Sequence, residues 1–162
     1  MNRYEDCNDE LVEVFLELLE SRFPAYGNLK FKIIFDLKKR IKQGKVVLAS
    51  IELASEKIKF FSKDDVAVDG YDYVLTVDKK AWELADEKDK RRIISHELRH
   101  VFINEKGAAK IIGHEIEDFY AELKLNEDDP EWARKLTTLV ADVYEQEREL
   151  AKAAKAGKKG GF

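Results

Sequence analysis

The chain has 162 residues, 38% of them charged, and a formal net charge of −4 at pH 7, which gives no global electrostatic case for nucleic-acid binding. This length predicts a single domain with a real hydrophobic core, and the one cysteine, Cys7, excludes an internal disulfide and is compatible with a reducing cytoplasm. Because the N-terminus lacks a signal-peptide pattern and no apolar run reaches the ~20 residues of a membrane span, we expect a soluble cytoplasmic protein.

The first part of the chain predicts one helix followed by strands. Residues 9–23 carry apolar side chains at helical spacing with glutamates between them, and Pro24 ends the pattern. Residues 30–35 and 46–51 are rich in β-branched and aromatic side chains. We therefore expect two paired strands joined through the turn at 42–45.

The middle of the chain predicts a further strand and two capped helices. Residues 58–61 suggest a short extended piece, and the alternation of apolar and polar side chains over 71–77 predicts a strand. Asp78 is placed to cap a short helix, and Asp86 to cap a longer one over residues 87–102. An aspartate suits these positions because its side chain accepts a hydrogen bond from one of the first backbone N–H groups of a helix.

The last third predicts a short strand at 110–112 and then a helix that begins near His114. A final helix is expected from Pro130, and the Lys-, Ala- and Gly-rich segment 151–162 is expected to be a basic, flexible tail. The order of helix, strands, helix, short strand and helix predicts an α+β fold. We assign it to a single domain over residues 1–150.

All three histidines of the chain, His96, His100 and His114, lie within one short stretch. His96 and His100 form a His-Glu-x-x-His pattern, so on a helix both imidazoles project from one face and can bind one metal ion. Apolar residues at helical spacing on both sides of the pattern favour a helix packed on the core over a solvated surface helix. Glu97 cannot join the same ligand set, but it can reach a water on the metal as a general base.

The third metal ligand is either a histidine or a nearby glutamate. His114 would complete the three protein ligands that a catalytic zinc usually takes, and Glu115, Glu117 and Glu122 are the alternatives. We favour His114 because it follows a short apolar run that can aim its side chain. Glu115, Glu117 and Asp118 also suit the first turn of a helix, where carboxylates complement the helix dipole. One of these three is placed to accept a hydrogen bond from a ligand imidazole.

Several segments resemble those of a known family when they are taken in order. Residues 72–77 followed by Trp82, then Ile-Ile-Ser-His-Glu-Leu-Arg-His-Val at 93–101 and Gly-His-Glu-Ile-Glu-Asp-Phe at 113–119, are similar to the strand, helix and two metal motifs of the putative phage metallopeptidase family. The SprT-like zinc proteases are a more distant resemblance. The similarity spans about residues 31–123, and the combination of motifs is much more specific than a His-Glu-x-x-His pattern alone.

The resemblance implies a minimal zincin-like fold, in which a small, mostly antiparallel sheet packs against an N-terminal helix, the motif helix and a C-terminal helix. It also implies that His96, His100 and His114 bind Zn²⁺ and that Glu97 is the catalytic base. Arg99 departs from the smaller or apolar residue expected at its position.

We therefore predict a zinc-dependent metallopeptidase that acts on a protein or peptide substrate. Zinc polarises the scissile carbonyl, and Glu97 carries a proton from water to the leaving amine. Tyr71, Tyr73 and Tyr120 are weak candidates for the donor that stabilises the oxyanion. A sheet edge beside the metal is expected to hold an extended peptide through main-chain hydrogen bonds.

Two other functional classes are considered. One is a catalytically silent, metal-stabilised binding or regulatory module of prophage or toxin-antitoxin type. The other is a nucleic-acid enzyme of the three-histidine endoribonuclease type, which the presence of Glu97 weighs against because those enzymes lack its equivalent. Contact with nucleic acid is expected only weakly, through the four lysines of the tail.

Overall fold

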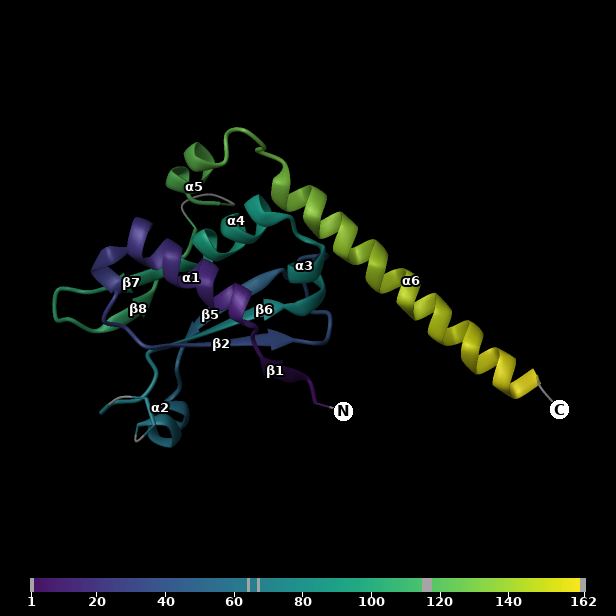
Figure 1. The fold of residues 1–162 in the computed structure, drawn as a ribbon, viewed down its shortest axis with the longest axis horizontal. Helices are drawn as coiled ribbons and strands as arrows, with labels where there is room; N and C mark the ends of the chain where they lie inside the picture. Colours follow the sequence, from purple (N-terminus) through teal and green to yellow (C-terminus); the bar gives the residue numbers. More distant parts are fainter. Residues whose placement is uncertain (1, 64, 67, 115–117, 161–162) are drawn as a thin grey trace.

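Four strands form the central sheet, in the order β1-β2-β6-β5. The structure is a computed structural model that describes residues 2–160 apart from 64, 67 and 115–117. β1 and β5 run antiparallel to their neighbours while β2 and β6 run parallel, so the sheet is mixed and mostly antiparallel. With the helices packed on it, this sheet confirms the predicted α+β class (Figure 1). The strands are β1 (Tyr4–Asp6), β2 (Phe31–Asp36), β5 (Ala49–Leu53) and β6 (Tyr73–Asp78).

Helices α1, α3 and α4 lie on one side of the sheet and α2 on the other (Figure 1). Each of them begins after a residue whose side chain accepts a backbone hydrogen bond from the first turn, namely Asn8, Ser55, Asp78 and Asp86. Such a cap stabilises a helix by about 0.5–2 kcal/mol. The two aspartate caps are therefore confirmed. The helices are α1 (Asp9–Arg22), α2 (Glu56–Ser62), α3 (Lys79–Leu84) and α4 (Glu87–Leu98).

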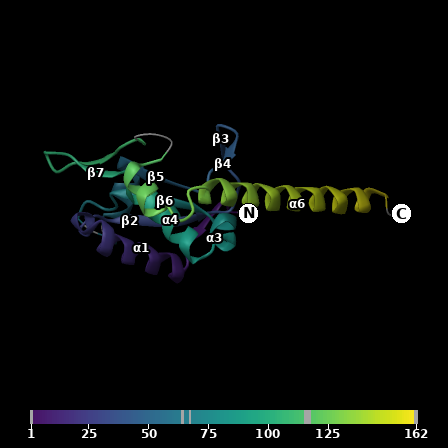
Figure 2. The same ribbon diagram turned by 90° about the horizontal axis from the view of Figure 1, so that it is seen from above.

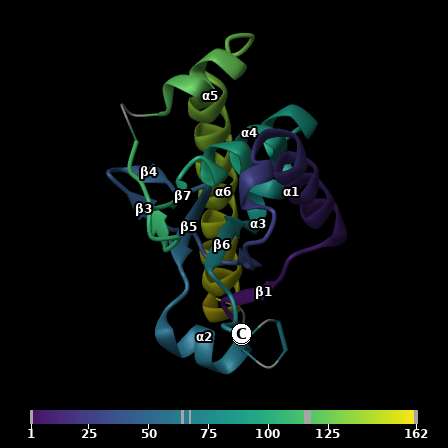
Figure 3. The same ribbon diagram turned by 90° about the vertical axis from the view of Figure 1, so that its left-hand side faces the viewer.

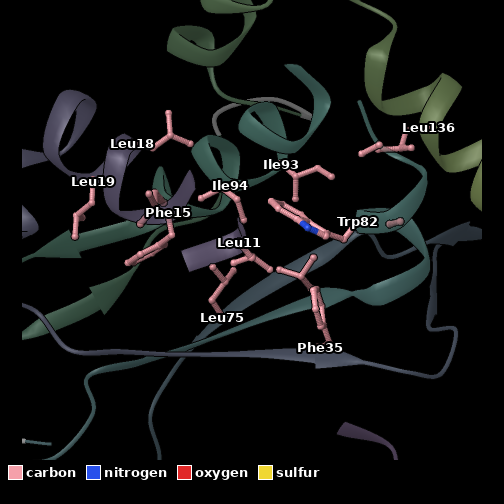
Figure 4. Packing of buried hydrophobic residues seen from close by; sticks show 14 of the residues in the cluster. Leu11, Phe15, Leu18, Leu19, Phe35, Leu75, Trp82, Ile93, Ile94 and Leu136 are labelled. Carbon is pink, nitrogen blue, oxygen red and sulfur yellow. The ribbon is translucent and has the colours of Figure 1, made fainter. Parts of the chain in front are cut away.

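The core lies between α1, α4 and the face of the sheet that they cover (Figure 4). Alternate residues of β2 and β6 supply the sheet side of the core, and the apolar stripes of the two helices supply the other side. Burying each large apolar side chain contributes about 1.5–3 kcal/mol, so this packing holds α4 firmly on the sheet. The side chains with 0% exposure include Leu11, Leu18, Leu75 and Ile94.

After α4 the chain turns back in a hairpin and then continues through two more helices (Figure 1). α5 lies against α4, at the opposite end of the fold from α2 (Figure 3). α6 begins on the core, where Trp132, Leu136 and Val140 are buried, and its second half extends away from the other elements (Figure 2). These elements are β7 (Val101–Ile103), β8 (Ala109–Ile111), α5 (Tyr120–Leu125) and α6 (Trp132–Gly160).

Smaller elements complete the architecture. A single 3-10 turn, η1, spans Pro24–Tyr26, and a two-stranded hairpin is formed by β3 (Ile41–Lys42) and β4 (Lys45–Val46). Over the part of the chain that the structure describes, no helix combines the length and the apolar character needed to cross a membrane.

The predicted pairing of the strands at 30–35 and 46–51 is wrong. β2 and β5 lie on opposite sides of β6, and the small β3–β4 hairpin occupies the turn between them. β6, which confirms the strand predicted at 71–77, takes the central place because all six of its residues are buried. A strand with two buried faces is stable between two neighbouring strands rather than at an edge.

Two helical predictions also differ from the structure. Residues 58–61, expected to be extended, form part of α2, because the Ser55 side chain accepts a hydrogen bond from the Ile58 N–H and starts a helix there. The helix predicted over 87–102 ends at Leu98, because the β-branched and aromatic residues of β7 pair with β8 instead.

The helix expected from His114 begins only at Tyr120. Phe119 is extended at the start of this helix, and its N–H donates to the Asp118 side chain at 2.8 Å. Because the backbone of Phe119 is extended, the helix starts only after it. Glu115 and Glu117 lie outside the described residues.

The segment from residue 151, expected to be a frayed tail, differs as well, because α6 continues through Gly160. Alanine and lysine have high intrinsic helix propensity, and they outweigh Gly157 here. Every side chain from residue 145 to 158 is exposed, so local propensity rather than packing supports this half of the helix. The division into a domain at 1–150 and a separate tail stays a prediction.

Candidate metal centre

Three imidazoles converge on one point beside the end of α4. The Nε2 atom of His114 lies 3.0 Å from Nε2 of His96 and 2.9 Å from Nε2 of His100. The ring nitrogens that the three residues offer lie within 4.8 Å of one another. Around a tetrahedral zinc with Zn–N bonds of ~2.0–2.1 Å, the nitrogens are spaced by about 3.3 Å. The spacing of the imidazoles is therefore close to that of a metal site.

The end of α4 and the hairpin bring these residues together. His96 lies in the last turn of α4, and His100 lies two residues beyond its end. The Arg99 N–H still donates to the Ser95 carbonyl at 3.1 Å, so helical geometry continues far enough to align the two histidines. The Ile112 N–H donates to the His100 carbonyl at 2.8 Å. This bond at the base of the hairpin brings the segment that carries His114 back to the motif.

The second ring nitrogen of two of the imidazoles is held by an acceptor. Nδ1 of His96 lies 2.7 Å from Oδ1 of Asp118, and Nδ1 of His100 lies 2.6 Å from the carbonyl oxygen of Ile112. Each Nδ1 therefore carries the proton, and the Nε2 lone pair is directed at the point of convergence. Asp118 is thus the acidic residue that accepts the hydrogen bond expected for a ligand imidazole.

The protonation states of the imidazoles fit a cation between them. Burial lowers the pKa of His100 and that of His114, which favours neutral rings near pH 7. Burial also lowers the pKa of His96, but the hydrogen bond with Asp118 and the charge of Glu97 outweigh it and raise the pKa overall. Nitrogen lone pairs about 3 Å apart repel one another unless a proton or a metal ion lies between them. The donor set therefore fits a divalent metal ion.

Phe119 forms an apolar wall against all three imidazoles. Its ring centre lies 5.4, 4.9 and 5.1 Å from the ring centres of His96, His100 and His114, in tilted or edge-on contacts. The residue is 1% exposed. It therefore restricts the rotation of all three rings and keeps water from one side of the cluster.

Glu97 is buried although it carries an ionisable group. The residue is 8% exposed, and burial raises the pKa of its carboxyl group from 4.5 to about 7. The positive charges of His96, Arg40 and Lys42 oppose this rise only in part. A carboxyl group with this pKa exchanges a proton readily near neutral pH, which suits a general base and acid.

Glu122, one of the alternative ligands, does not face the imidazoles. It is 0% exposed, and its Oε1 atom accepts a hydrogen bond from the Ser95 hydroxyl at 2.5 Å. It also approaches Arg99, whose Nε lies 3.7 Å away. Arg99, which departs from the residue expected at its position, therefore has an ionic partner in Glu122. The other two alternatives, Glu115 and Glu117, lie outside the described residues.

Two of the tyrosines proposed as oxyanion donors, Tyr71 and Tyr73, are not brought to the imidazoles. The hydroxyl of Tyr73 donates to the Lys110 carbonyl at 2.8 Å and so anchors the β7–β8 hairpin. Tyr71 lies beside α2, on the other face of the sheet. The side chain of Tyr120 is outside the described part of the structure.

Positive charge near the site is not predicted from the sequence. Burial is the largest influence on the pKa of Glu97, His100 and His114. The charge of Lys42, on β3, adds to the lowering at the two histidines, and together with Arg40 it opposes the rise at Glu97. The β3–β4 hairpin therefore directs positive charge towards the motif. A lysine in a short turn has no distinguishing pattern in the sequence, so only the fold identifies it.

A comparison with protein families finds a match. The family described as putative phage metallopeptidase matches residues 3–144. Neither the curated proteins nor the solved structures contain a match to the chain. The matched range includes the central sheet, the three histidines and Glu97, and it ends where the exposed half of α6 begins.

Proposed function

We propose that this chain, which belongs to the putative phage metallopeptidase family, is a zinc-dependent peptidase with His96, His100 and His114 as ligands and Glu97 as general base. The observation that carries the proposal is the convergence of the three Nε2 atoms. A buried carboxylate follows directly after the first of these histidines. The family description supports the proposed reaction class, and the geometry supports the proposed residues.

Zinc is the proposed metal because of the donor set. Three imidazoles, with no sulfur or carboxylate joining them among the described residues, are typical of catalytic zinc, which leaves a fourth position open. When bound, the zinc would make water acidic near pH 7 and polarise the carbonyl group of a substrate. Asp118 and the Ile112 carbonyl hold His96 and His100 in the tautomer that presents Nε2 to the metal.

Glu97 has the properties of the residue that moves the proton. Burial raises the pKa of its carboxyl group to about 7 in the metal-free protein, and its place directly after His96 would let it accept a proton from the attacking water and release it to the leaving amine. Burial keeps this carboxyl group away from competing bulk water. General-base catalysis of this kind contributes about 10²–10⁴ to a rate.

The proposed substrate is an extended peptide on the edge of the sheet. β5 is an outermost strand and lies against α4, whose end carries the motif. Among the described strands, none pairs with its outer side. Backbone groups on such an edge are free to bond an added strand, which is a common way of holding a peptide. A cytoplasmic location remains part of the proposal.

Replacing Glu97 with glutamine tests the enzyme against a silent metal-binding module. We expect Glu97→Gln to keep stoichiometric zinc and to lose peptide cleavage by about 10²–10⁴, because an amide cannot accept the proton. The assays are metal analysis of protein purified without added zinc and cleavage of a peptide library. If Glu97→Gln binds zinc and retains every measurable effect of the wild type, the peptidase proposal is wrong and the module is right.

Glu87→Gln is the matched control. Glu87 lies on the same helix as Glu97 but is exposed at the N-terminal end. The substitution Glu87→Gln therefore makes the same chemical change away from the site. It should leave both zinc content and cleavage unchanged. A similar loss of cleavage in both variants would point to a general effect on α4 rather than to proton transfer.

A further inference from the structure

A second pair of side chains on the motif helix has the spacing of His96 and His100 but faces elsewhere. Ser95 and Arg99 each precede one of these histidines, and a step of one residue turns a helix by about 100°. Ser95 is 0% exposed, and the side chain of Arg99 is 27% exposed. The pair is therefore directed at a different neighbour from the metal centre.

That neighbour is Glu122 in the first turn of α5. The Ser95 hydroxyl donates to Oε1 of Glu122 at 2.5 Å, and Nε of Arg99 lies 3.7 Å from the same oxygen. Arg22, at the end of α1, donates from Nη1 to the Ser95 oxygen at 2.9 Å. We call these four residues the Glu122 network. It joins α1, α4 and α5 through a carboxylate that has no exposure to solvent.

A buried carboxylate is a costly way to join helices. Apolar side chains of similar size often give equal or greater stability than a buried ion pair. In the described part of the chain, Oε2 of Glu122 and Nε of Arg99 have no hydrogen-bond partner, so the network is not arranged for maximal stability. What directional polar contacts do supply is one defined placement of α5 on α4.

The placement of α5 matters for the metal centre because of the residues just before it. Asp118 holds Nδ1 of His96, and Phe119 packs against all three imidazoles. Both residues lie about one helical turn before Glu122, and His114 precedes them on the same connection between β8 and α5. Movement of α5 on α4 would therefore displace Asp118 and Phe119 from the rings that they orient.

We infer that Glu122 is a positioning residue for the metal centre. It fastens α5 to the back of the motif helix through Ser95 and Arg99, and it thereby keeps Asp118 and Phe119 in the places that align the imidazoles. The inference rests on the proposed function only in that a metal ion must bind at the three histidines. Glu122 is therefore not a metal ligand, and it affects metal binding only through Asp118 and Phe119.

The affinity for metal ions tests this inference directly. The dissociation constant for Zn²⁺ is measured by competition with a chromophoric chelator, and the visible spectrum is recorded with Co²⁺ in its place. In Ser95→Ala and Glu122→Ala we expect the Zn²⁺ dissociation constant to rise about 10-fold. This is the low end of the loss of metal affinity that follows when residues supporting the ligands are replaced. The Co²⁺ spectrum should change with it. The Zn²⁺ dissociation constant of the Ser95→Ala, Glu122→Ala double variant should be no higher than that of Glu122→Ala alone, because Ser95 acts through its hydrogen bond to Glu122.

Val140→Ala is the matched control for lost stability. Val140 is 0% exposed in the main core, on α6, so its truncation should lower the midpoint of urea unfolding and leave the Zn²⁺ dissociation constant unchanged. If Ser95→Ala and Glu122→Ala behave in the same way as Val140→Ala, the network is only structural and the inference is wrong. Should Glu122→Ala fail to fold, Ser95→Ala carries the same test with the loss of one hydroxyl group.

Peptide cleavage is not among these measurements. A wild-type protein that binds zinc but cleaves no peptide would overturn the proposed function and leave the role of Glu122 standing. A wild-type protein that binds neither Zn²⁺ nor Co²⁺ would overturn both. The two failures are therefore distinguishable.

Discussion

Replacing Glu97 with glutamine should make the metal-free protein more stable at pH 8 and change its stability little at pH 4. Burial raises the pKa of Glu97 from 4.5 to about 7 in the folded protein, against the opposing charges of His96, Arg40 and Lys42. The metal-free fold therefore favours the neutral acid. Glutamine has nearly the same size and carries no charge at any pH.

The magnitude follows from the difference between the folded and the unfolded pKa. Between pH 4.5 and about 7 the folded state binds the Glu97 proton more tightly than the unfolded state, so the free energy of unfolding falls as the pH rises through this window. At about 1.4 kcal/mol per pKa unit, the loss reaches an upper value of about 3 kcal/mol above pH 7. Entry of water on ionisation reduces it, so we expect Glu97→Gln to gain roughly 1–3 kcal/mol at pH 8.

The assay is urea unfolding of the metal-free wild type, Glu97→Gln and Glu87→Gln, with a chelator present, at several pH values from 4 to 8. The stability difference between Glu97→Gln and the wild type should grow from near zero to its full value across the window and then level off. Glu87→Gln, at an exposed position, should show no such trend. A difference that is flat with pH, or a less stable Glu97→Gln at pH 8, would refute the argument that Glu97 is held in a desolvated site.

Three further changes test the metal centre and the end of α6. His96→Ala, His100→Ala and His114→Ala should each lose most of their zinc in metal analysis, and unchanged zinc in all of them would exclude this site. Asp118→Asn should weaken zinc binding about 10–100-fold in chelator competition, and an unaltered dissociation constant would mean that its bond to His96 is dispensable. Truncation after Leu150 should change the free energy of unfolding by less than ~0.5 kcal/mol, because the removed side chains from 151 to 158 are exposed. Loss of zinc on truncation would show that this segment is packed. Any weak binding of nucleic acid should decrease on truncation and become less dependent on salt.

The local elements of the fold could be predicted because their determinants are neighbours in the sequence. Asp78 and Asp86 accept hydrogen bonds from residues three positions ahead, and the stripe of α1 repeats every three or four residues. The strand β6 was recognised from its own composition. The predicted pairing of β2 with β5 failed because strand order depends on which strand needs two buried faces, and this is decided by burial in the whole fold.

For the candidate site, the sequence by itself determined which residues are predicted: the spacing of His96 and His100, with Glu97 between them, suits one face of a helix. Only the tertiary structure brought His114 within 3.0 Å of them and assigned Asp118, rather than another carboxylate, to the His96 ring. These choices depend on the hairpin and on α5. The structure also decided the raised pKa of Glu97 and the inward position of Glu122, because desolvation is a property of packed neighbours that are distant along the chain.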